Sequence, residues 1–174
     1  MILDLTRLFL FPALIAFAAA SDLLTMTISN RVSLLLLAGF FVLAAFGGMP
    51  MQSIALHAGA GIAVLVVAFG CFAMGWVGGG DAKIAATAAL WFGFDHLMNF
   101  LVYASLFGGA LTLMLLEFRQ WPLPYVLGSQ QWLQRLHDRQ SGIPYGIALA
   151  LGALVIYPET EWIKAVDLAR FIGH

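Results

Sequence analysis

A stretch of 49 residues from Val32 to Gly80 contains no Asp, Glu, Lys or Arg. A helix that crosses the hydrocarbon core of a bilayer needs about 20 mostly apolar residues. The stretch is therefore too long for one crossing and long enough for two. Gly47-Gly48-Met49-Pro50 lies within it and is typical of a turn between two such helices.

The composition of the whole chain agrees with this reading. Of its 174 residues, 62% are hydrophobic and 10% are charged. Soluble domains have about 45–50% apolar and about 25% charged residues. A soluble core of this size could not bury so many apolar side chains. The composition excludes an ordinary soluble enzyme, a nucleic-acid-binding protein and a disordered tail, and it indicates an integral membrane protein.

Charged residues divide the chain into six apolar segments, each a candidate membrane helix. The fourth is short for a full crossing, so we expect it to tilt or to pack inside a bundle. The predicted fold class is an all-α integral membrane protein, a bundle of about six transmembrane helices with little extramembrane mass. The expected helices span residues 2–20, 32–46, 54–74, 81–94, 98–116 and 143–156.

The polar segments predict the orientation. Residues 117–142 form a polar loop in which we expect a short helix at 131–136, and residues 159–174 have the pattern of a helix lying on the membrane surface. Cytoplasmic loops are enriched in Lys and Arg. One side of the predicted topology carries five such residues and the other carries three, so we expect the first side to be cytoplasmic and both termini to be outside. The two sets are Arg31, Lys83, Arg119, Arg135 and Arg139, against Arg7, Lys164 and Arg170.

The first 20 residues also have features of a signal peptide, because Ala18-Ala19-Ala20 precedes Ser21. Cleavage there would remove the first helix. Asp4 argues against this alternative, since a signal peptide begins with a basic segment.

Two carboxylates are predicted to lie on the same side of the membrane. Asp22 ends the first expected helix and Asp81 begins the fourth, so an even number of crossings separates them. The same count places Asp95 on the opposite side. Acidic residues next to hydrocarbon are costly and often functional. Two carboxylates that meet there can share one proton, so that one activates a water while the other polarises a carbonyl.

A structural role for the same residues remains open at this point. Asp81 follows Gly78-Gly79-Gly80 and could simply cap the N-terminus of the fourth helix, with Lys83 reaching toward the interface. Asp22 could likewise be an interfacial residue at a helix end.

Three segments in this order resemble those of type IV prepilin peptidases, which are GxGD intramembrane aspartyl proteases. Gly78-Gly79-Gly80-Asp81-Ala82-Lys83 resembles the GxGDxK motif of that family. Asp22, followed by Ile28-Ser29-Asn30, resembles the segment in which the first aspartate precedes Ile-Pro-Asn. Pro144-Tyr145-Gly146 resembles the C-terminal PYG segment. Together the three segments extend the resemblance over nearly the whole chain.

The resemblance implies an aspartic-type endopeptidase with Asp22 and Asp81 as its catalytic pair. It implies that the protein removes the short basic leader from prepilins and pseudopilins, cutting after a glycine at the cytoplasmic face of the bacterial inner membrane. Prepilins, pseudopilins, the lipid bilayer and a pilus or secretion assembly are then the expected partners, with no nucleic acid and no cofactor. The implied supporting residues are Asn30, Gly78, Gly80, Lys83, Pro144, Tyr145 and Gly146.

The chain departs from the family pattern at two points. Ser29 stands where the family usually has proline, although a serine there can cap the second helix. Long members have an N-terminal domain with paired cysteines, and this chain has one cysteine, Cys71. We therefore expect a single membrane domain over residues 1–174, similar to the short branch that serves Flp-type tight-adherence pili, without methyltransferase activity.

Other polar and aromatic residues predict no separate site. The sequence has no HExxH motif and no close Cys/His cluster, so we predict no metal, and His57 and His96 are expected at the outer interface. The five tryptophans fall near predicted helix ends, where interfacial belts occur. Two other functions stay open: a small proton-coupled transporter or channel with Asp81 and Lys83 as a gated charge pair, and an inactive structural subunit of a pilus or secretion assembly.

Overall fold

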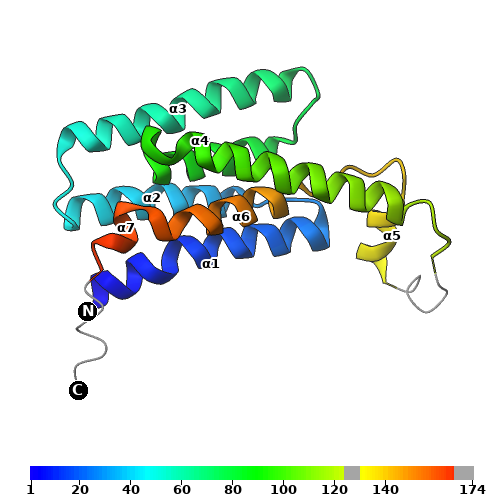
Figure 1. Ribbon diagram of the computed structural model, residues 1–174, viewed down its shortest axis with the longest axis horizontal. Coiled ribbons are helices and arrows are strands. Elements are labelled where there is room, and N and C mark those ends of the chain that lie inside the picture. The colour runs from blue at the N-terminus through cyan, green and yellow to red at the C-terminus, as the bar shows by residue number, and fades with distance from the viewer. Residues whose placement is uncertain (124–129, 167–174) are drawn as a thin grey trace.

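The computed structural model describes residues 1–123 and 130–166, which form helices and no strand (Figure 1). The helices lie side by side as a bundle. Their bounds are α1 (Ile2–Thr25), α2 (Asn30–Phe46), α3 (Met51–Ala73), α4 (Gly79–Phe118), α5 (Gln131–His137), α6 (Tyr145–Ile156), the 3₁₀ turn η2 (Tyr157–Glu159) and α7 (Glu161–Lys164).

Three of these helices, α1, α3 and α4, are long and apolar enough to cross a membrane, and α2 and α6 are shorter apolar helices. The 40 residues of α4 contain a break at Gly93, where the backbone is not helical. The break divides α4 into two helices that correspond to the fourth and fifth expected crossings. The protein is an all-α membrane protein whose bundle has about six transmembrane helices, as the sequence predicts.

Side chains from two other helices form hydrogen bonds with the backbone carbonyls at the break in α4. Gly93 has φ 60° and ψ −174°, a conformation that is essentially restricted to glycine. In an unbroken helix the carbonyls of Leu90 and Trp91 would accept hydrogen bonds from residues 94 and 95. Instead, Nδ1–H of His57 donates to Leu90 and Nε1–H of Trp162 donates to Trp91, each at 2.8 Å. The chain can therefore turn back without leaving these two buried carbonyls unpaired.

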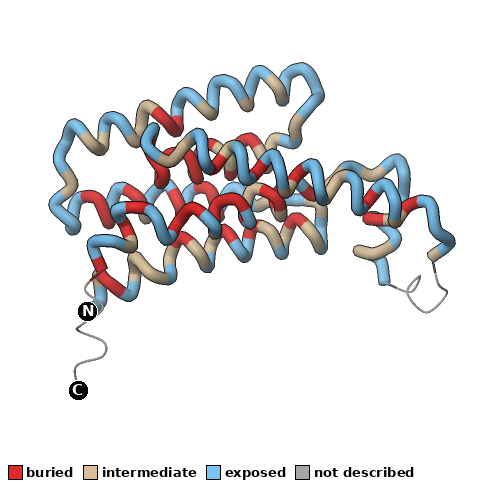
Figure 2. The backbone as a smooth tube through the Cα atoms, viewed as in Figure 1, coloured by how far each residue is buried: buried red, intermediate tan, exposed pale blue. Residues whose placement is uncertain are grey.

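The centre of the bundle is formed by α4, which packs against α2, α3 and α6, and α1 packs against α2 and α6. In contrast, α3 lies at the edge and buries only Ala60 and Gly61 among its residues. Figure 2 shows it as a mostly exposed helix. Few contacts join α2 to α3, so the two helices leave a space between them that α4 closes from behind.

Aromatic rings fill the core at the end of the bundle that holds the N-terminus. The ring of Phe11 lies 5.0 Å from that of Trp91 and 4.6 Å from that of Tyr157, and Trp162 lies 5.0 Å from Trp91. Trp91 is fully buried and donates a 3.0 Å hydrogen bond from Nε1 to the carbonyl of Leu36. The prediction of an interfacial belt is therefore wrong for Trp91 and Trp162, because both indoles find carbonyl partners inside the bundle.

The segment after α6 also differs from its prediction. The expected surface helix at 159–174 contains the short α7, whose Trp162 faces the bundle core instead of the membrane surface. Residues 167–174 lie outside the described residues. The short helix expected at 131–136 is confirmed as α5.

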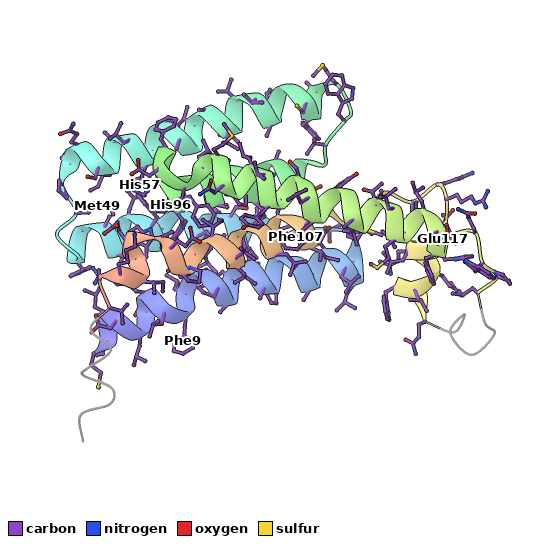
Figure 3. All side chains as sticks on the ribbon, in the orientation of Figure 1. Phe9, Met49, His57, His96, Phe107 and Glu117 are labelled. Atoms are coloured by element: carbon purple, nitrogen blue, oxygen red, sulfur yellow. The ribbon has the colours of Figure 1, made fainter. Side chains whose placement is uncertain are left out.

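The two ends of the bundle carry different groups. His57 and His96 lie at one end and Glu117 lies at the opposite end (Figure 3). The second end also receives the C-terminus of α1, the N-terminus of α2, the N-terminus of α4 and the N-terminus of α6, since each crossing reverses the chain direction. We call it the carboxylate end, because Asp22 and Asp81 both belong to it.

Candidate active site

Asp22 lies in the last turn of α1, which extends five residues beyond its predicted end at residue 20. The residue is 6% exposed, and its Oδ2 accepts a 2.8 Å hydrogen bond from the backbone N–H of Gly146 at the start of α6. A buried carboxylate without a partner is costly. The Gly146 N–H supplies that partner and fixes the direction in which the carboxylate points.

The backbone after Asp22 turns sharply back toward the bundle. Met26 adopts the left-handed conformation, with φ 53°, and its N–H donates a 2.7 Å hydrogen bond to the carbonyl of Asp22. This is a common way to end a helix. Ser29 then caps α2, because its hydroxyl accepts a hydrogen bond from the N–H of Arg31 at 3.3 Å. The predicted capping role of Ser29 is confirmed.

Asp81 is the third residue of α4, and Gly78 occupies the capping position before the helix. Asp81 is therefore not the N-cap, contrary to the structural alternative above. Its carboxylate reaches back toward the start of the helix, where a Cβ on Gly78 would lie 2.8 Å from Oδ2, in the direction taken by the third residue of a capping box. The other oxygen, Oδ1, is buried and has no hydrogen-bond partner among the described residues.

The two carboxylates lie close enough to interact electrostatically. Asp22 and Asp81 are 59 positions apart in the sequence. The bundle brings them to the same end, as the count of crossings predicts. This arrangement suits a pair that acts as an acid and a base.

Ile28 connects the elements that hold the two carboxylates. A Cβ placed on Gly80 would lie 3.2 Å from Cβ of Ile28, and one placed on Gly146 would lie 3.0 Å from its Cδ1. The Ile28 side chain therefore packs against the first turns of both α4 and α6. The motif that contains Ile28 indicates no role for this residue, because only the structure shows the two glycines on either side of it.

Two glycines touch the carboxylates directly. A Cβ at Gly78 would lie 2.8 Å from Oδ2 of Asp81, and one at Gly146 would lie 2.8 Å from Oδ2 of Asp22. Real Cβ atoms are essentially never found at that distance from an oxygen. At these two positions a side chain would displace the carboxylate, which explains why the site needs bare backbone there.

The predicted supporting residues Asn30 and Lys83 form a direct pair. Nζ of Lys83 donates a 2.8 Å hydrogen bond to Oδ1 of Asn30. The bond joins the first residue of α2 to the first turns of α4, across 53 positions of the sequence. It holds the Asp22–Asn30 connection against the helix that carries Asp81.

The Pro144-Tyr145-Gly146 segment forms the start of α6. Pro144 is fully buried and directly precedes the helix, which begins two residues later than predicted because a proline restricts the residue before it to extended backbone. The hydroxyl of Tyr145 lies 3.1 Å from Oγ1 of Thr112 on the second half of α4, within hydrogen-bond distance. All three residues of this motif are thus at the carboxylate end.

Arg119 positions the segment that leads to α6. This buried side chain donates hydrogen bonds from Nε to the carbonyl of Leu136 at 2.7 Å and from one terminal nitrogen to the carbonyl of Gly142 at 2.9 Å. In the sequence, Arg119 stands out only as a positive charge in a loop. Its role was not visible in the sequence because both of its partners are backbone carbonyls of a distant loop.

A groove of about 980 Å³ opens beside Asp81, between α3, both halves of α4, and α6. We call it the larger groove. Its walls are mainly apolar, many of its residues are small, and Asp81 and Tyr145 are among its lining residues. The small residues that line it are Ala63, Ala68, Ala82, Ala85, Ala104, Ser105, Gly108, Gly109 and Ala148.

The third acid, Asp95, lies away from this site. It lines a different cavity, of about 360 Å³, together with Arg7, His57 and Glu161 at the opposite end of the bundle. The predicted separation of Asp95 from Asp22 and Asp81 is therefore correct. Within residues 1–123 and 130–166, no three His, Cys, Asp or Glu side chains gather as a metal-binding group.

Comparison with known proteins gives one match. The type IV leader peptidase family matches residues 9–113, a range that includes Asp22 and Asp81, most of α1, all of α2 and α3, and most of α4. No curated protein and no solved structure matches the chain. The match does not extend to the α6 segment, although α6 supplies the amide that contacts Asp22.

Proposed function

Because the chain belongs to the type IV leader peptidase family, we propose that it is an aspartic-type endopeptidase that cleaves prepilins and pseudopilins, including those of the Flp type. Asp22 and Asp81 act as the catalytic pair. The cut follows a glycine and releases the short basic leader at the cytoplasmic face of the inner membrane. The coarser conclusion, a membrane-embedded peptidase, follows from the family and the fold alone.

One observation carries the proposal. Two carboxylates from different helices lie at one end of the bundle, where the Gly146 N–H orients Asp22 and the Asp81 carboxylate turns back against Gly78. A structural carboxylate would normally use both of its oxygens. Oδ1 of Asp81 is buried but unpaired among the described residues, and burial of an unpaired polar atom is costly. A reacting water or a substrate carbonyl would supply the partner.

The chemistry requires no covalent intermediate. The ionised carboxylate accepts a proton from a water, and the water oxygen adds to the carbonyl carbon of the scissile peptide bond. The protonated carboxylate donates a hydrogen bond to the carbonyl oxygen and stabilises the developing charge. The carbon–nitrogen bond then breaks, and the leaving amine receives a proton from the acid pair.

The larger groove supports a substrate that is itself a membrane helix. The groove is apolar and reaches Asp81, so a hydrophobic helix lying in it would bring the residue before its N-terminus to the catalytic pair. Small residues at four-residue spacing let helices approach closely in a membrane. Ala104, Gly108 and Thr112 have this spacing on the wall formed by α4. A soluble peptide would not need such a surface.

The charge distribution supports the proposed orientation. Five cationic residues belong to the connections at the carboxylate end, while Arg7 and Lys164 belong to the opposite end. Short loops rich in Lys and Arg remain in the cytoplasm. The leader would then be cut on the side where the precursor is synthesised.

The experiment is co-expression of a short Flp-type prepilin with the wild type, Asp22→Asn and Asp81→Asn, followed by the pilin size on a gel. We expect the wild type to shorten the pilin and both variants to leave it full length at equal membrane levels. Asp95→Asn is the matched control, since it removes a carboxylate just after the break in α4, at the end of the bundle opposite to Asp81. This variant should cleave normally.

Two outcomes would count against the proposal. Cleavage by either Asp22→Asn or Asp81→Asn would exclude the two-aspartate mechanism. No cleavage of Flp-type or longer prepilins by a well-expressed wild type would leave a transporter or an inactive subunit. An ion flux in vesicles that depends on Asp81 would then identify the transporter.

A further inference from the structure

A second groove lies on the other side of α4. This smaller groove of about 500 Å³ runs between α2, α3 and the first half of α4. Asp81 lines the larger groove and Lys83 lines the smaller one, so the first turns of α4 separate the two. Because few contacts join α2 to α3, the smaller groove faces the lipid that surrounds the bundle.

Polar groups line the smaller groove only near the carboxylate end. Asn30 and Lys83 are at the mouth, and Ser33 lies about one helical turn deeper along α2. The wall continues with the apolar side chains of Leu37 and Phe41 toward the middle of the bilayer. The groove therefore changes from charged to polar to apolar along its length.

The Ser33 hydroxyl has an unusual environment. Ser33 is 9% exposed, and its Oγ is buried without a hydrogen-bond partner among the described residues. A serine inside a helix commonly bonds to a carbonyl of the preceding turn. Nearly all buried polar atoms have a hydrogen-bond partner, so a buried hydroxyl without one indicates a site where a further group can bind. Ser33 lines the smaller groove, and rotation about its χ1 to another staggered rotamer would turn the hydroxyl toward the groove, where an acceptor atom would satisfy it.

Lys83 provides a positive charge at the same groove. Its ammonium group has three N–H donors, and the bond to Asn30 uses one of them. Neither of the two salt bridges found in the described part of the chain involves Lys83. The exposed Arg31 follows Asn30 and places a second positive charge at this end of α2.

We propose that the smaller groove binds one acyl chain of an anionic glycerophospholipid. Its phosphate lies beside Lys83, an ester carbonyl accepts the Ser33 hydroxyl, and the acyl chain lies along Leu37 and Phe41. The order phosphate, ester, hydrocarbon along such a lipid matches the order of groups along the groove. The assignment does not depend on the proposed peptidase activity.

The size of the smaller groove favours an acyl chain over a second substrate helix. The smaller groove, at about 500 Å³, has about half the volume of the larger groove, at about 980 Å³. The Asp81 carboxylate also lines the larger groove and not the smaller one. The two grooves thus suit different occupants.

The test is native mass spectrometry of the purified protein after equilibration with equal amounts of phosphatidylglycerol and phosphatidylcholine of identical chains. Both lipids present a phosphate to Lys83, but the choline cation would place a like charge beside the ammonium group, so we expect the wild type to retain one phosphatidylglycerol about tenfold more often than phosphatidylcholine. Lys83→Gln should remove this preference. Leu37→Trp, which fills the groove, should lose both lipids.

Val42→Trp is the matched control, because Val42 is an exposed α2 residue outside both grooves. It should retain the lipid as the wild type does. Ile62→Trp fills the groove from the opposite wall on α3 and replaces Leu37→Trp if that variant does not fold. The proposal is overturned if the wild type shows no preference for phosphatidylglycerol, if Lys83→Gln keeps that preference, or if filling the groove affects retention no more than Val42→Trp does.

Discussion

The backbone N–H of Gly146 donates a 2.8 Å hydrogen bond to Oδ2 of Asp22, across 124 positions of the sequence. The bond joins the last turn of α1 to the first turn of α6. It is made where both groups are buried, so water cannot replace it cheaply. The orientation of one candidate catalytic carboxylate thus depends on a residue of the last apolar helix.

Gly146→Ala should abolish or strongly reduce cleavage while the protein still inserts. The new Cβ would lie 2.8 Å from Oδ2 of Asp22 and 3.0 Å from Ile28, so the carboxylate or the start of α6 must move. A displacement of about 1 Å in an active site can cost about a hundredfold in rate. The co-expression assay measures this effect. Gly142→Ala is the control, because its Cβ would meet nothing within 4 Å; equal activity of the two variants would show that the Asp22 contact is dispensable.

Gly93→Ala should destabilise the bundle by about 1–3 kcal/mol, the usual cost of a residue held in a disfavoured backbone conformation. Gly93 has φ 60°, and a Cβ there would also lie 3.0 Å from the ring of His57. Thermal unfolding in detergent measures the change. Gly109→Ala in the same helix should have the opposite sign and stabilise by about 0.5–1 kcal/mol, because its Cβ would enter open space. An unchanged melting temperature for Gly93→Ala would refute the restriction to glycine.

Ser105→Phe should block cleavage without preventing folding. Ser105 lines the larger groove, and a phenyl ring there would occupy the space proposed for the substrate helix. The neighbouring Leu106 is exposed and does not line the larger groove, so Leu106→Phe should leave cleavage unchanged. Pilin processing at matched expression levels distinguishes them. Full activity of Ser105→Phe would mean that the substrate helix binds elsewhere.

Arg119→Met should lower both stability and cleavage. The substitution removes two hydrogen bonds from a buried guanidinium to the carbonyls of Leu136 and Gly142, and a bond to a charged group contributes about 1.5–3 kcal/mol. The segment before Pro144 would lose the hydrogen bonds that hold it against α4. Arg135→Met is the control, since Arg135 makes one exposed 3.3 Å bond to the carbonyl of Leu24. Thermal unfolding and the cleavage assay should both rank Arg119→Met below Arg135→Met.

Much of the fold could be predicted from where charges are absent. The apolar runs between charged residues correspond to the helices, and the turn at Gly47-Gly48-Met49-Pro50 lies between α2 and α3 as expected. The count of crossings correctly brought Asp22 and Asp81 to one end. Hydropathy is sufficient for these features because a membrane helix satisfies its own backbone and needs no partner to form.

The failed predictions concern contacts between helices. Trp91 and Trp162 have the sequence position of interfacial residues, yet each donates to a buried carbonyl, and the carbonyl used by Trp162 is one that the break at Gly93 leaves unpaired. A hydropathy pattern does not reveal which carbonyls a kink exposes. The roles of Ile28 and Arg119 depend in the same way on backbone groups of distant segments.

The contact between Gly146 and Asp22 also has a consequence for how the protein is made. Both aspartates leave the ribosome and enter the bilayer before α6 does, because α6 follows them in the chain. A nascent protein with only its first helices inserted has both acids but lacks the amide that orients Asp22. The order of synthesis therefore keeps the candidate catalytic centre incomplete until the last apolar helix is in place.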